Sequence, residues 1–103
     1  MRKAMVLVHG RLSGLLTELG DGAGYLFEYL EGYDGPPVSL TMPTTQRRYE
    51  YSSFPPFFDG LLPEGYQLEA LLRLQKLDRD DMFGQLVAVG GDMVGAVTVE
   101  AAP

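Results

Sequence analysis

Cysteine and tryptophan are absent from this 103-residue sequence, and His9 is its single histidine. Without cysteine the chain has no disulfide framework and no thiolate to act as a nucleophile or metal ligand. Carboxylates remain as ligands, but Asp78, Asp80 and Asp81 lack the glycine and glutamate of a calcium-binding loop. We therefore expect no metal ion and no cofactor, and we interpret these aspartates as helix caps.

Basic residues are also few. Eight lysines and arginines stand against fourteen acidic residues, which gives a net charge of −6. Nucleic-acid binding depends on cations that neutralise phosphates, so this balance argues against direct contact with DNA or RNA. An acidic surface favours a basic protein partner or serves solubility alone.

Long apolar runs are missing as well. Residues 4–8 form a short apolar run that ends at His9 and Gly10, far below the roughly 20 apolar residues that span a bilayer. The run is also too short for a signal peptide, and no small-residue cleavage site follows it. We expect a cytoplasmic protein without a membrane-bound segment, made of one domain over residues 1–103.

The segments that are present indicate an α+β fold. Apolar and aromatic stretches separated by glycine and proline predict a β-meander, with strands at residues 4–8, 14–19, 25–30, 38–42 and 47–51. The predicted turns fall at Gly10–Arg11 and at residues 20–22, and a loop covers residues 34–37.

The second half has the apolar period of helices. Its pattern predicts helices at residues 57–62 and 66–77 and a third through Phe83, Leu86 and Val87, capped by Asp78 or Asp80. A final strand at residues 93–100 returns to pair with an early strand, and residues 101–103 are expected to fray. The predicted fold is a small antiparallel or mixed sheet, a meander plus a returning C-terminal strand, packed with about three short helices.

No set of residues forms a catalytic constellation. His9 follows a strand and has neither a cysteine nor a nucleophile elbow to accompany it. The glycines of residues 20–24 lack the Gly-Lys-Ser/Thr ending of a phosphate loop and precede a strand. Arg47 and Arg48 are interpreted as solvated side chains. We expect a protein that is not an enzyme.

The strongest candidate site is the turn formed by Pro63, Glu64, Gly65 and Tyr66. Proline and glycine place a sharp turn between two helices, and an exposed tyrosine beside a rigid turn is a common anchor for protein contacts. In the alternative interpretation Tyr66 packs inward against the helix that it begins. The residues alone leave both interpretations open.

Several segments, in this order, resemble the N-terminal subdomain of HipA-type toxin kinases. They are an opening hairpin, a Leu-Ser-Leu-x-x-Pro-like element, a Phe-Phe-x-Asn/Gly-Leu-Leu-Pro-Asp/Glu signature and a Val-Gly-Ala-Val ending, found at residues 14–29, 38–43, 57–64, and 82–83 with 94–97. The resemblance covers nearly the whole chain. The lysine and aspartates of the kinase active site lie beyond this subdomain, so the resemblance implies neither ATP binding nor phosphotransfer here.

The resemblance implies a function through protein contact. In three-gene HipBST systems this subdomain is a separate small protein, HipS, which neutralises the kinase HipT alongside the helix-turn-helix protein HipB. The implied partners are a HipT/HipA-like serine/threonine kinase and a HipB-like protein. We place the kinase contact at the turn from Pro63 to Tyr66.

Alternatives remain at this stage. The first alternative is a non-inhibitory structural subdomain of a HipA-type kinase complex, and the second is a fragment of a full-length HipA-type kinase. Its exposed aromatic residues, especially Tyr66 and some of Tyr25, Tyr29 and Tyr33, also fit a homodimer interface.

Overall fold

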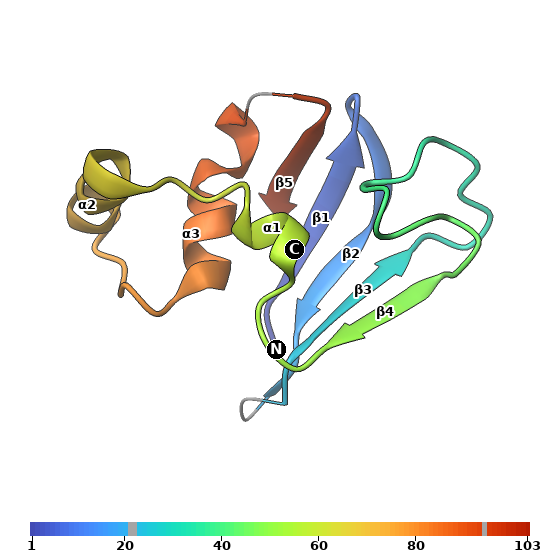
Figure 1. The fold of residues 1–103 in the computed structure, drawn as a ribbon, viewed down its shortest axis with the longest axis horizontal. Coiled ribbons are helices and arrows are strands. Elements are labelled where there is room, and N and C mark those ends of the chain that lie inside the picture. The colour runs from blue at the N-terminus through green and yellow to red at the C-terminus, as the bar shows by residue number, and fades with distance from the viewer. Residues whose placement is uncertain (21–22, 94) are drawn as a thin grey trace.

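The computed structural model describes residues 1–20, 23–93 and 95–103. Five antiparallel strands form one sheet in the order β4-β3-β2-β1-β5, and helices pack against it (Figure 1). The elements in chain order are β1 (Lys3–Val8), β2 (Arg11–Glu18), β3 (Tyr25–Tyr29), β4 (Arg48–Tyr51), α1 (Pro56–Asp59), α2 (Gly65–Gln75), α3 (Met82–Val89), the 3₁₀-helix η2 (Gly90–Asp92) and β5 (Val97–Ala101). The predicted α+β class and the returning last strand are confirmed.

The strands β1 to β4 form a meander, and the end of the chain returns to add β5 beside β1. β1 lies between β2 and β5, and β5 pairs with it in the register Ala4↔Ala101 and Val8↔Val97. The side chains of β1 alternate, so Ala4, Val6 and Val8 are buried on one face of the sheet. The covered face therefore carries the small and branched residues that a close-packed layer of helices requires.

The core lies between this face and the helices α1 and α3. Phe58 of α1 and Leu86 of α3 are 0% exposed, as are Leu16 and Phe27 of the sheet. The ring centroids of Phe27 and Phe58 are 6.0 Å apart. In Figure 1, α3 lies between the sheet and α2, so α2 is the helix farthest from the core.

The strand predicted at residues 38–42 is wrong. The segment is part of the loop between β3 and β4 and contains a single bridge, between Ser39 and Met42. The hydroxyl of Tyr29 donates to the Met42 carbonyl and accepts from the Val38 amide at 2.9 Å. This buried hydroxyl satisfies loop groups that a ladder would otherwise pair, and it draws Val38 and Met42 into the core.

The helix ends differ from the prediction for local reasons. α1 ends at Asp59, and the chain then continues to Leu62 through i→i+3 hydrogen bonds rather than α-helical ones. Neither Asp78 nor Asp80 caps α3. Asp81 does so, because its side chain accepts from the amide of Gly84 at 3.0 Å.

The last strand is shifted toward the C-terminus relative to the prediction. β5 begins at Val97 rather than at residue 93, because its partner β1 ends at Val8. Ala101 is paired in the sheet, and the Ala102 amide donates to the Lys3 carbonyl at 3.0 Å, so these residues are not frayed. Of the turn predicted at residues 20–22, positions 21 and 22 lie outside the described residues.

Candidate partner-binding surface

The turn before α2 presents Tyr66 to solvent. Glu64 is extended, with φ −129° and ψ 164°, and Gly65 has a φ of 57°, in the region that favours glycine. The reversal at Gly65 leaves the side chain of Tyr66 95% exposed. Of the two interpretations of this tyrosine, the outward one matches the structure. The turn therefore holds an aromatic ring, beside an exposed carboxylate, away from the domain.

α2 is helical as expected, but its apolar face is not buried. None of its residues, all of which the structure describes, belongs to the core. Leu74 is 77% exposed, and Leu68, Leu71 and Leu72 are half-buried. The helix ends where Lys76 adopts a φ of 54° and the Leu77 amide donates to the Leu72 carbonyl at 3.0 Å.

An apolar groove separates α2 from α3. It has a volume of about 730 Å³. It is lined by residues of α2, of the α1–α2 connection and of the C-terminal part of α3 with the chain after it, namely Gly60, Leu61, Leu62, Pro63, Gln67, Ala70, Leu71, Leu74, Gln75, Ala88, Val89 and Met93. The described residues that line it include no charged side chain. Pro63 lines the groove and is also part of the turn that presents Tyr66, so the groove is continuous with this turn.

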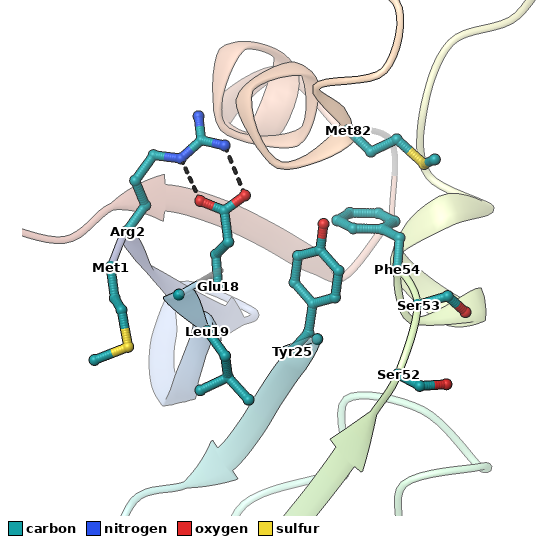
Figure 2. A pocket seen from close by; sticks show the side chains of 11 residues that line it. Met1, Arg2, Glu18, Leu19, Tyr25, Ser52, Ser53, Phe54 and Met82 are labelled. Carbon is teal, nitrogen blue, oxygen red and sulfur yellow. Dashed lines mark hydrogen bonds and ion pairs between the residues drawn. The ribbon is translucent and has the colours of Figure 1, made fainter. Parts of the chain in front are cut away.

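A second hollow, of about 570 Å³, lies near the N-terminus (Figure 2). Arg2 donates from Nε and Nη2 to the two carboxylate oxygens of Glu18 at 2.7 and 2.8 Å, and from Nη2 to Asp81 Oδ1 at 2.7 Å. The same guanidinium lies 5.0 Å from the centre of the Phe83 ring. Hydrogen bonds from Arg2 hold the pKa of Glu18 and the pKa of Asp81 below their ordinary values.

This charged cluster is a structural clamp. Arg2 precedes β1, Glu18 ends β2 and Asp81 caps α3, so the three side chains tie the start of the chain to the sheet and to a helix. On the other side of the hollow, the rings of Tyr25 and Phe54 meet edge to face with centroids 5.2 Å apart. No histidine lies among the described residues that line it, and its one carboxylate, Glu18, is paired with Arg2.

The remaining candidate residues have structural positions. His9 is exposed in the β1–β2 turn, with a φ of 50°. Arg47 and Arg48 are not simply solvated. The Nε of Arg47 donates to the Tyr29 carbonyl at 3.0 Å, and Arg48 pairs with Glu28 at 2.9 Å. Among residues 1–20, 23–93 and 95–103, no three histidine, cysteine or acidic side chains are grouped to hold a metal ion, and no helix is long and apolar enough to cross a membrane.

Of the four tyrosines considered for a homodimer interface, three pack within the domain. Tyr29 is buried at 3% exposure, and Tyr33 stacks on it with ring centroids 5.5 Å apart. Tyr25 is half-buried against the core. Tyr66 is thus left alone as the exposed tyrosine of the group, far from the other three in sequence.

The groove and the clamp were both missed from the sequence. Arg2 and Asp81 are 79 positions apart, and no local pattern links them. The leucines at 71 and 74 gave a signal for the groove, because they widen the apolar face of α2. That signal indicates a face that seeks burial, but it does not say whether the chain itself covers it.

A family profile and a solved structure both identify the family of this chain. The profile of the HipA N-terminal domain matches residues 4–100. An uncharacterized protein of Haemophilus influenzae is 35% identical over 100 residues, a match that covers 97% of this chain and 92% of that protein. A solved structure described as the N-terminal domain of HipA toxin is 34% identical and superimposes with a TM-score of 0.80, covering 100% of this chain and 94% of that one. The chain belongs to the HipA N-terminal domain family.

Proposed function

We propose that this protein is an antitoxin that binds a HipA/HipT-type serine/threonine kinase by direct contact and neutralises it. Membership of the HipA N-terminal domain family supports a function beside such a kinase. The Haemophilus influenzae relative is itself little longer than the matched region, which supports a role for this domain apart from a kinase chain. The observation that carries the proposal is the almost fully exposed Tyr66 on a glycine turn.

In this proposal the residues Pro63, Glu64, Gly65 and Tyr66 enter or cover the active site of the kinase. Kinase active sites hold phosphates with a lysine and divalent cations, so they attract a carboxylate. Glu64 is exposed beside Tyr66, and the chain carries a net charge of −6, which favours encounter with a cationic cleft. The tyrosine ring supplies contact area at a small entropic cost, because it has two rotatable side-chain bonds.

The proposal places the protein in the cytoplasm with its kinase and assigns it a non-catalytic role. It includes a HipB-like helix-turn-helix protein as a second partner. Contact with DNA would then come from that partner, because the acidic chain repels phosphates.

Growth of bacteria that express a HipA/HipT-type kinase of the same organism tests the proposal. We expect co-expression of the wild-type protein to restore growth and Tyr66→Ala to fail to do so. Leu40→Ala serves as a matched control, because Leu40 is 94% exposed in the β3–β4 loop. Rescue by Tyr66→Ala at equal protein levels would refute the placement of the contact at this turn.

A second function, a non-inhibitory structural subunit of the kinase complex, is favoured by one observation. The uncovered leucines of α2 suit a stable docking surface whether or not the kinase is inhibited. Co-purification of the two chains without any rescue of growth would select this function over the antitoxin.

A further inference from the structure

α2 is a helix whose stabilising contacts are incomplete within the domain. Helices of fewer than about 12–15 residues are marginal in water, and most of their stability in proteins comes from burying an apolar face. α2 has 11 residues, and none of them is buried. Leu74, on the side of the groove, is 77% exposed. The helix therefore carries an apolar face that is suited to a partner.

The groove beside α2 defines the chemistry of that partner. One wall is formed by Leu71 and Leu74 of α2, and the other by Ala88 and Val89 of α3. The polar side chains that line it are two glutamines, and no charge is present among its described residues. Such a surface binds an apolar, uncharged segment, because a charged one would lose hydration without gaining an ion pair.

The position of the groove identifies the molecule that supplies this segment. Pro63 belongs both to the groove and to the turn that presents Tyr66, so one protein that covers the turn also reaches the groove. The similar solved structure is described as the N-terminal domain of HipA toxin, so in that protein more of the chain follows this domain. We propose that the α2–α3 groove docks an apolar segment of the same HipA-type kinase that the turn contacts. This inference rests on the proposed function.

Docking and neutralisation are then separate properties of two adjacent sites. The groove supplies affinity through buried leucine side chains, and the Tyr66 turn acts on the kinase active site. Burial of a leucine side chain contributes enough to change affinity by about tenfold to a hundredfold. Replacing Leu74 with lysine removes this contribution and places a charge in an apolar interface. We expect the replacement of Tyr66 to affect neutralisation more than docking.

The test uses three lysine variants and a catalytically inactive HipA/HipT-type kinase of the same organism. Leu74→Lys and Ala88→Lys alter opposite walls of the groove at exposed positions, so we expect both variants to keep the fold. Leu40→Lys adds the same charge at a leucine that is 94% exposed and lies outside the groove. Circular dichroism verifies folding, and isothermal titration calorimetry measures the Kd of each variant.

The expected result is a Kd raised at least about tenfold by both groove variants and unchanged by Leu40→Lys. We also expect Tyr66→Ala to lose growth rescue while raising the Kd less than either groove variant does. Unchanged binding by both groove variants, beside firm binding of the wild type, would overturn the groove inference and leave the proposed function standing. Absence of binding by the wild type would overturn both. A self-dimer that Leu74→Lys dissolves would assign the groove to a second copy instead.

Discussion

Truncation of Phe58 tests whether the one-turn helix α1 anchors the core. Phe58 is 0% exposed and packs against Phe27 at 6.0 Å between ring centroids. Replacing a buried phenylalanine with alanine costs about 3–5 kcal/mol, through lost transfer free energy and the cavity left behind. We therefore expect Phe58→Ala to lower the free energy of unfolding by about 3 kcal/mol or more, even after partial relaxation of the short helix.

The expected change in melting temperature follows from this loss of unfolding free energy and from the chain length. An unfolding entropy of about 2.1 cal/mol/K per residue gives about 0.2 kcal/mol/K for a chain of 103 residues, so the expected decrease in Tm is about 15 °C. The control is Leu74→Ala, because Leu74 is 77% exposed and its truncation should change stability by less than about 0.5 kcal/mol. Thermal and urea unfolding followed by circular dichroism measure both. Equal losses in the two variants would refute the division between an α1 that belongs to the core and an α2 outside it.

Two further predictions concern contacts at the edges of the sheet. In Gly90→Ala the new Cβ would lie 2.0 Å from the Val99 carbonyl oxygen, so we expect the free energy of unfolding, measured with urea, to fall by about 2 kcal/mol. The control is Gly91→Ala, which should unfold like wild type because the space around its Cβ is open. Arg2 lowers the pKa of Glu18, so the ion pair stabilises the fold above the unfolded pKa of about 4.3, and this contribution is lost as the pH falls through the folded value. Glu18→Gln should therefore lower the free energy of unfolding by about 0.5–1 kcal/mol at neutral pH and by much less in acid, and an equal loss at both pH values would contradict the role of the pair.

Local patterns in the sequence predict most of the fold. The alternation of Ala4, Val6 and Val8 and the turn residues after them are enough to identify a buried strand and its reversal. The helical spacing of the apolar residues along positions 66–77 likewise identifies α2. The prediction fails at residues 38–42, where a tyrosine hydroxyl from another strand replaces the ladder partners of the backbone. Such contacts depend on tertiary structure, which no local pattern encodes.

The candidate surface is predictable to a smaller extent. Pro63 and Gly65 indicate the rigid turn, but whether Tyr66 points outward depends on the φ of 57° at Gly65 and on what lies nearby. The groove depends on the distance of α2 from the sheet, which the apolar period of Leu71 and Leu74 leaves open. Periodicity shows that a helix has an apolar face, and only the packing of the whole chain shows that this face is left uncovered.

Direct binding between the two purified proteins tests the central claim. The wild-type protein and an inactive HipA/HipT-type kinase of the same organism are mixed, and size-exclusion chromatography with light scattering measures the mass of each species. The account predicts a single complex whose mass is the sum of the two chains. Elution of the two proteins at their separate masses, with both shown to be folded, would contradict it.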